Sequence, residues 1–165
     1  MKTAGIVCEY NPMHKGHIYH IEETRKNGAT HIVCVMSGNF VQRGECAFLD
    51  KWSRADIAVH SGADLVVELP TFLSADSAEN FAFGAVSILS SLGIDILSFG
   101  SETDDKDLLK SVSDISDEKL SSVIKTGIEK GLSYPSALRE AVQSLYGEME
   151  AEVISSPNST LGIEY

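Results

Sequence analysis

The residues best suited to chemistry in this sequence are two histidines, His14 and His17, spaced His-x-Gly-His. An apolar run at residues 4–8 precedes them and a helical pattern at residues 18–26 follows, so they lie between a predicted buried strand and a predicted helix. Unpaired backbone N–H groups and the helix dipole favour anions at such a junction. Imidazoles placed there can donate hydrogen bonds to a phosphoryl group as its charge grows in a transition state. The arrangement suits nucleotidyl transfer, in which an anionic nucleophile attacks the α-phosphate of ATP and pyrophosphate leaves.

Taken alone, this histidine spacing also fits ordinary surface residues or part of a metal site. Asn11-Pro12 favours a turn just before the histidines, and Gly16 would let a ligand approach the backbone closely. This context supports a catalytic role for His14 and His17. A zinc site is disfavoured, because no cysteine pair has metal-ligand spacing and the two histidines have no evident third ligand in the sequence.

The elements that position the histidines follow an alternating order. Strands are predicted at residues 4–8, 30–36, 64–70 and 95–99, and helices between them at residues 18–26, 51–60 and 76–92. The run at residues 30–36 is continuously apolar, as expected of a parallel strand covered on both faces. The alternation predicts an α/β fold, a Rossmann-like doubly wound parallel sheet with right-handed crossovers. We expect the first strand beside a topological switch point, and Ile6, Val33, Val66 and Leu97 in adjacent central strands.

Several chemically useful residues follow directly after predicted strands. Besides the histidine turn, these are Gln42, Arg43, Pro70 and Gly100. Because ligands of doubly wound sheets bind outside the carboxyl ends of the strands, we expect these residues at one edge. Gln42 and Arg43 are candidates for contact with a phosphate or carboxylate, although Arg43 also fits an ordinary surface residue.

The helix predicted at residues 51–60 starts with Asp50 as its N-cap. Helical spacing predicts that its core-facing residues are Trp52, Ala55 and Val59. Lys51 and Arg54, one turn apart, are predicted to form a small basic edge whose role stays open.

The composition is that of a soluble globular protein, with 165 residues, 43% hydrophobic and 22% charged, so we expect one domain. A formal net charge of −11 disfavours a broad nucleic-acid-binding face. Cys8 and Cys34 lie in apolar runs and are predicted to be small core residues in a reducing compartment, whereas Cys46 is predicted to be exposed. Without a signal-peptide pattern or an apolar run near ~18 residues, we expect a cytoplasmic protein that contacts no membrane.

From Asp104 the sequence becomes acidic and rich in serine, and helical patterns predict a helical subregion at about residues 104–147. Asn158 or Ser159 is predicted to cap a last helix, yet the chain stops at Tyr165, within its first turns. The sequence therefore predicts a domain that is truncated at its C-terminal end.

The string HKGH at residues 14–17 resembles the histidine signature of the HIGH-type nucleotidyltransferase superfamily, which includes class I aminoacyl-tRNA synthetases and cofactor adenylyltransferases. The longer string EYNPMHKGH at residues 9–17 resembles, more narrowly, the tRNA(Met) cytidine acetate ligase family. Four further strings carry that narrower resemblance: MSGNFVQRGE (36–45), DLVVELP (64–70), FGSE (99–102) and PNSTLGIEY (157–165).

The resemblance implies an enzyme that uses ATP to activate acetate as acetyl-adenylate and then acetylates N4 of the wobble cytidine of elongator tRNA(Met). It implies that residues 1–165 form the ATP-binding nucleotidyltransferase domain, with His14 and His17 as catalytic residues on the phosphates. The implied ATP contacts are Val7, Cys8, Glu9, Tyr10, Asn11, Pro12, Met13, His14, Lys15, Gly16, His17, Ile18, Tyr19, His20, Gly100 and Asn158. Mg²⁺ is expected to accompany ATP.

Members of that family are longer, with an arginine beyond the position of Tyr165 and a C-terminal helical part expected to help bind tRNA. We therefore expect weak tRNA binding from this chain alone. Two other functions stay open: a cofactor adenylyltransferase of the pantetheine or nicotinamide mononucleotide type, and a nucleotide-binding module without catalysis.

Overall fold

The computed structural model describes residues 1–115 and 117–165, except for the side chains of Arg43, Asp117, Glu118 and Pro157. Two compact units are distinguished, Met1–Phe99 with Tyr165, and Gly100–Glu164. The strands of the first unit are β1 (Thr3–Cys8), β2 (His31–Ser37), β3 (Leu65–Leu69) and β4 (Ile96–Ser98). Its helices are α1 (Lys15–Lys26), α2 (Lys51–His60), α3 (Thr71–Ser74) and α4 (Ala78–Ser91), with a 3₁₀ turn at Gln42–Gly44.

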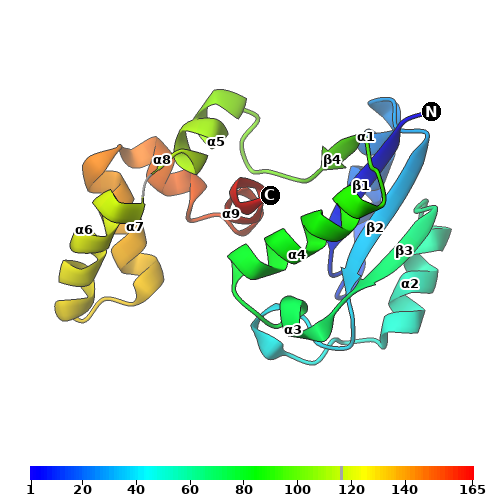
Figure 1. Ribbon diagram of the computed structural model, residues 1–165, viewed down its shortest axis with the longest axis horizontal. Coiled ribbons are helices and arrows are strands. Elements are labelled where there is room, and N and C mark those ends of the chain that lie inside the picture. The colour runs from blue at the N-terminus through cyan, green and yellow to red at the C-terminus, as the bar shows by residue number, and fades with distance from the viewer. Residues whose placement is uncertain (116) are drawn as a thin grey trace. The chain divides into compact units, whose positions relative to one another are not determined.

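The four described strands form one parallel sheet in the order β3-β2-β1-β4 (Figure 1). From β1 the chain moves outward through β2 to β3, and the segment containing α4 then returns it to the other side of β1. The predicted α/β fold and the switch point at β1 are therefore confirmed. Val66 and Leu97 differ from the prediction in one respect, because their strands are the outer two of the four described.

Both faces of the sheet are covered, which explains why the strands are continuously apolar. On one face Ile6 and Cys34 pack in a cluster with Ile21 of α1 and Ala58 of α2. Gly5 points to the other face, where an added Cβ would come within 2.8 Å of Leu89 on α4. Figure 1 shows α4 running across that face.

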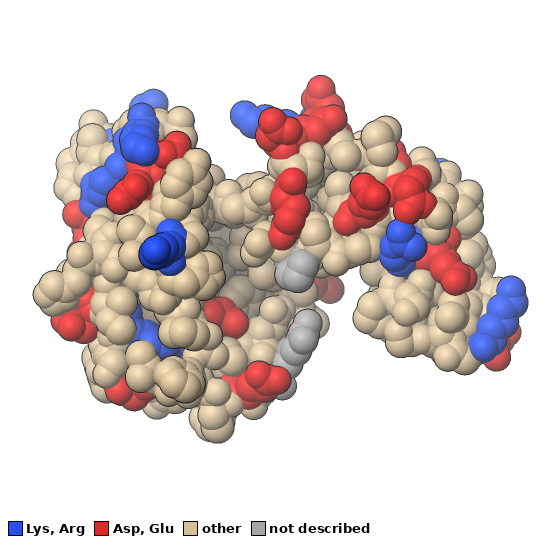
Figure 2. Space-filling model, turned by 180° about the vertical axis from the view of Figure 1, so that it is seen from behind, with Lys and Arg blue, Asp and Glu red and all other residues tan. Residues whose placement is uncertain are grey.

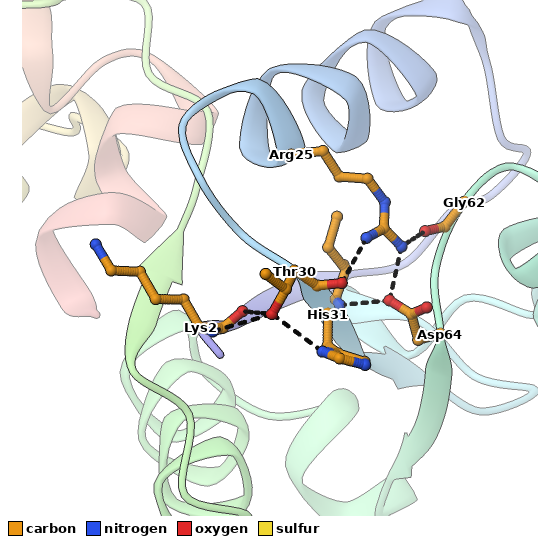
Figure 3. Close-up of polar contacts among 7 residues, drawn as sticks. Lys2, Arg25, Thr30, His31, Gly62 and Asp64 are labelled. Carbon is orange, nitrogen blue, oxygen red and sulfur yellow. Dashed lines mark hydrogen bonds and ion pairs between the residues drawn. The ribbon is translucent and has the colours of Figure 1, made fainter.

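A network of polar contacts joins the amino ends of the strands (Figure 3). Asp64 Oδ2 accepts hydrogen bonds from the backbone N–H of Ile32 (2.7 Å) and from Arg25 Nη2 (2.7 Å). Arg25 also donates to the carbonyl oxygens of Gly62 (2.8 Å) and Thr30 (2.9 Å). We call Arg25, Thr30, Gly62 and Asp64 the amino-end clamp. It holds the end of α1 and the starts of β2 and β3 together.

Helix α2 departs from the predicted pattern. Asp50 is the N-cap, as predicted, and accepts from the N–H groups of Trp52 and Ser53. However, Trp52 is 75% exposed and Val59 is 47% exposed, so the predicted core stripe is wrong at both positions. Arg54, predicted on a basic edge, is 1% exposed. Arg54 faces the interior because it donates hydrogen bonds to backbone carbonyl oxygens of other segments. The periodicity of the helix contains no information about such distant partners.

The second unit is helical, as predicted for the C-terminal region. Its helices are α5 (Lys106–Ser113), α6 (Asp117–Glu129), α7 (Tyr134–Leu145), α8 (Glu148–Val153) and α9 (Pro157–Glu164). A small core holds it together, formed by Leu120, Ile124, Ala137, Ala141, Val142 and Ala151. Figure 2 shows Asp and Glu side chains scattered over this unit, in line with the acidic composition. Among the described residues, no helix has the length and apolar character needed to cross a membrane.

Candidate active site

The two histidines cap the start of α1. His14 is the N-cap, with extended backbone angles, and its Nδ1 accepts a hydrogen bond from the N–H of Gly16 (3.1 Å). His17 Nδ1 accepts in return from the N–H of His14 (3.2 Å), which completes a capping box. The two rings stack, with centroids 3.6 Å apart and an interplanar angle of 21°. The capping therefore fixes both imidazoles at the helix N-terminus.

The structure gives a local reason for Gly16, and the predicted approach of a ligand stays a prediction. A Cβ at this position would lie 3.0 to 3.1 Å from the ring of His14. The missing side chain thus makes room for the capping imidazole, whether or not a ligand also approaches the backbone there. The His-x-Gly-His spacing is explained by the cap itself.

These hydrogen bonds assign the protons on the two rings. Because each Nδ1 accepts from a backbone N–H, the proton of a neutral ring must lie on Nε2, where it is a donor. Burial, together with the neighbouring imidazoles of His14 and His20, lowers the pKa of His17 to about 4. His17 is therefore a neutral hydrogen-bond donor at pH 7. Such a donor can stabilise negative charge that builds on a phosphoryl oxygen.

Beneath the histidines lies Tyr10, which is 2% exposed. Its ring centroid is 5.0 Å from that of His17, and its hydroxyl lies 3.6 Å from Cys34 Sγ. Its φ of 46° is uncommon for a residue other than glycine, and packing against the core holds it there. Burial raises the pKa of both Tyr10 and Cys8. Tyr10 and Cys8 therefore stay protonated, and Cys8 and Cys34 pack in the core as predicted.

One turn beyond His17, the ring of His20 is engaged within the fold. Its Nε2 lies 2.9 Å from Ser98 Oγ on β4, and Ser98 Oγ lies 2.7 Å from Thr24 Oγ1. Burial lowers the pKa of His20. This contact ties α1 to the carboxyl end of β4. The roles of Ser98 and Thr24 were not predicted, because neither belongs to a recognisable motif.

Two residues predicted to contact ATP are engaged with the loop between β2 and α2. Glu9 Oε1 accepts from Ser37 Oγ (3.1 Å) and from the N–H of Gln42 (2.7 Å). Asn11 Oδ1 accepts from the N–H of Phe48 (2.6 Å). The turn after β1 and the loop after β2 are therefore joined through these two side chains. Their predicted contact with ATP stays a prediction.

The other predicted contacts are distributed over both units. Val7 and Met13 are partly buried in the first unit, whereas Pro12, Lys15, Gly16, Ile18 and Tyr19 are exposed. The backbone of Arg43 lies in the 3₁₀ turn, but its side chain is outside the described residues, so its ligand role stays a prediction. Gly100 and Asn158 belong to the second unit, and their contact with a nucleotide also stays a prediction.

Within the second unit, Glu102 organises the start of α9. Its Oε1 accepts from Asn158 Nδ2 (2.9 Å), and its Oε2 accepts from Ser159 Oγ (2.7 Å) and from the N–H of Ser159 (3.0 Å). Burial opposes ionisation of Glu102, but hydrogen bonds, the strongest of them from the Ser159 hydroxyl, outweigh burial and lower its pKa. Glu102 therefore holds the amide of Asn158 in one orientation. Only its place in the FGSE string pointed to it beforehand.

Within the part of the chain that the structure describes, no group of three or more His, Cys, Asp or Glu side chains gathers to hold a metal ion. The geometry offers imidazole N–H donors at a helix N-terminus, beside the switch point of a parallel sheet. This combination defines a class of protein, the α/β nucleotide-binding domains that act on phosphoryl groups.

Residues 1–165 match the family model described as HIGH Nucleotidyl Transferase, and the chain belongs to this family. It is 46% identical to the tRNA(Met) cytidine acetate ligase of Clostridium novyi and 47% identical to that of Acetivibrio thermocellus, in each case over the whole chain. A crystal structure of Thermotoga maritima TmcAL bound with alpha-thio ATP superimposes with a TM-score of 0.86 at 38% identity. These findings confirm both resemblances noted in the sequence.

The coverage of these relatives is partial. This chain corresponds to 43% of the Clostridium novyi protein, 41% of the Acetivibrio thermocellus protein and 42% of the Thermotoga maritima chain. It therefore spans about two fifths of the length of the relatives it matches.

Proposed function

We propose that this chain is the nucleotidyltransferase part of an enzyme that activates acetate with ATP and acetylates N4 of the wobble cytidine of elongator tRNA(Met). The names of the relatives and the ATP analogue bound by the Thermotoga maritima protein support this proposal. The observation that carries it is the pair of stacked imidazoles whose Nδ1 atoms are held by the backbone at the start of α1.

The proposed reaction has two steps. In the first, a carboxylate oxygen of acetate attacks the α-phosphorus of ATP, the bond to the pyrophosphate oxygen breaks, and acetyl-adenylate forms. His14 and His17 donate from Nε2 to phosphate oxygens as charge builds on them. In the second, the N4 amine of cytidine attacks the acetyl carbonyl, AMP leaves, and the amine loses a proton.

We propose that the segment from Val7 to His20 binds ATP, together with Gly100 and Asn158, and that Gln42 and Arg43 contact a phosphate or carboxylate group. Mg²⁺ is expected to arrive with the triphosphate, since this ion is commonly bound through substrate phosphates with one or two carboxylates. A tRNA substrate also supports the expected cytoplasmic location. Residues 1–165 would then act as one ATP-binding domain within a longer enzyme.

The test is ATP–pyrophosphate exchange, measured in a chimera in which this chain replaces the matching segment of the Acetivibrio thermocellus ligase. Acetate, phosphopantetheine and nicotinamide mononucleotide are supplied in separate reactions. We expect exchange with acetate only. Exchange with either of the other substrates would instead indicate a cofactor adenylyltransferase, and ATP binding without exchange would indicate a non-catalytic module.

A further inference from the structure

Arg54 is a buried cation that the proposed chemistry does not use. It is 1% exposed, and its guanidinium donates only to backbone carbonyl oxygens among its described hydrogen-bond partners. Nη1 donates to Glu9 (2.6 Å), Nη2 donates to Gly38, and Nε donates to Leu49 (3.1 Å). These carbonyls belong to the turn after β1, the loop after β2 and the segment before α2. One side chain therefore joins three segments at the carboxyl end of the sheet.

The charge of Arg54 is not matched by an ion pair among the described residues. Burial lowers the pKa of the guanidinium, against the opposing effect of the Glu9 carboxylate, but an arginine remains protonated in either case. Burying a cation without an ion-pair partner is costly, and the hydrogen bonds to three carbonyl oxygens offset only part of that cost. The buried charge of Arg54 therefore points to a role beyond stability.

The planarity of the peptide bond indicates what role Arg54 has. When the carbonyl oxygen of Glu9 points at Arg54, the N–H of the same trans peptide group, which belongs to Tyr10, points the opposite way. The same holds for the carbonyl of Gly38 and the N–H of Asn39. Arg54 thus turns the negative ends of two peptide dipoles inward and their positive ends away from the buried guanidinium.

We propose that Arg54 is a positioning residue for ATP binding, which orients the peptide groups after β1 and β2 so that their positive ends face the phosphates. This inference rests on the proposed function, because it takes ATP as the ligand. It also explains the residue type. Lysine has a single ammonium group and cannot replace a planar fork that donates to three carbonyls at once.

The test compares Arg54→Met with Arg25→Met in this chain, using calorimetric titration with ATP and with adenosine. Arg25 is the matched control, because it also donates to two backbone carbonyls but lies in the amino-end clamp. We expect Arg54→Met to weaken ATP binding at least about tenfold and to change adenosine binding by less than about twofold, since only phosphate contacts depend on the oriented peptides. Arg25→Met should leave both affinities within about twofold of wild type.

Equal losses for ATP and adenosine in Arg54→Met, or unchanged ATP affinity, would overturn the inference. If Arg54→Met does not fold, Arg54→Lys replaces it, with the same phosphate-dependent loss expected. Amide hydrogen exchange in the ligand-free chain tests the positioning separately. Tyr10 and Asn39 should exchange faster in Arg54→Lys than in wild type and Arg25→Met, and unchanged exchange would refute the role of Arg54. A wild-type chain that binds no ATP would instead count against the proposed function.

Discussion

The two ends of the sheet hold neighbouring backbone segments together in different ways. At each end an arginine donates hydrogen bonds to backbone carbonyls of neighbouring segments, Arg25 at the amino ends and Arg54 at the carboxyl ends. Arg25 also forms an ion pair with Asp64 at 2.7 Å, whereas Arg54 has no such partner among the described carboxylates. At the amino end the arginine is paired with a carboxylate, whereas at the carboxyl end a buried positive charge contacts the turn that leads to the two histidines.

This difference separates stability from ligand binding. In the amino-end clamp, donors and acceptors are paired with one another, so little is left to attract a ligand. At the carboxyl end, the Nδ1 atoms of His14 and His17 are used by the fold, while their Nε2 protons remain as donors. A polar network whose donors and acceptors are all paired within the protein rigidifies the fold. Donors that have no partner within the protein can bind an anion. The predictions below test this division.

The largest effect is expected at the carboxyl end, from His14→Asn and His17→Ala. Asparagine is a good N-cap, so His14→Asn should keep α1 while it removes the Nε2 donor. In the chimera, we expect kcat for acetyl-adenylate formation to fall by ~10²–10³ in each variant, the usual loss for one preorganised donor. ATP affinity should change less, because the backbone N–H groups of the turn after β1 are also expected to contact the phosphates.

The matched control is His31→Asn, which makes the same substitution at the start of β2. It should keep kcat within about twofold, since surface changes away from a site usually have small effects. Wild-type rates in both His14→Asn and His17→Ala would leave the assignment of the histidines without support.

At the amino end, we expect Asp64→Ala to lower stability and to leave ATP binding unchanged. The substitution removes the acceptor for the N–H of Ile32 and the partner of Arg25. We expect the free energy of unfolding to fall by ~1–3 kcal/mol, as when a hydrogen-bonding group loses its partner, with ATP affinity unchanged. Denaturant titration and calorimetry measure the two quantities.

Asp56→Ala serves as the control for charge alone, because Asp56 pairs with His60 at an exposed site. Its effect on the free energy of unfolding should stay within about 0.5 kcal/mol. A loss of ATP affinity in Asp64→Ala would break the proposed division between the ends.

The pH dependence of stability should also differ between the ends. The folded-state pKa of His17 is about 4, below its ordinary value of 6.5, so the unfolded chain binds more protons between these values. Stability from His17 is therefore complete above about pH 6.5 and is lost as the pH falls towards 4. Asp64 also has a lowered pKa: its slight burial opposes ionisation, but hydrogen bonds from Ile32 and Arg25 outweigh that effect. Its contribution should be lost only below the ordinary pKa of aspartate, 3.8.

Thermal melts from pH 7 to pH 3 test this order. His17→Ala should flatten the curve between pH 6.5 and 4, where Asp64→Ala should leave the slope unchanged. A His17→Ala curve parallel to that of wild type would show that the histidine titrates at its ordinary pKa.

The smallest effect is expected in the binding of tRNA to the isolated chain. Phosphate contacts dominate affinity for nucleic acids, and this chain carries a formal net charge of −11. We expect only weak, salt-sensitive binding of tRNA(Met) to the isolated chain in a gel-shift assay. Sub-micromolar affinity at physiological salt would contradict this prediction.

Local features could be predicted because neighbouring residues alone produce them. Asp50 caps its helix through the N–H groups of Trp52 and Ser53, and the first helix ends at Lys26, as predicted. The His-x-Gly-His turn belongs to this group, since the capping contacts of His14 and His17 span only two or three residues. Helix α3 was missed, because Thr71–Ser74 is too short to show a period.

By itself, the sequence determined the alternation of strands and helices, the parallel sheet and the turn that carries the two histidines, because apolar runs, caps and turns are local. Only the tertiary structure decided that Arg54 is buried while Trp52 is exposed. Arg54 and its carbonyl partner Glu9 lie 45 residues apart, and Glu9 and Gln42 lie 33 apart. Such contacts form only when the sheet has brought distant segments together, and no periodicity in the chain records them.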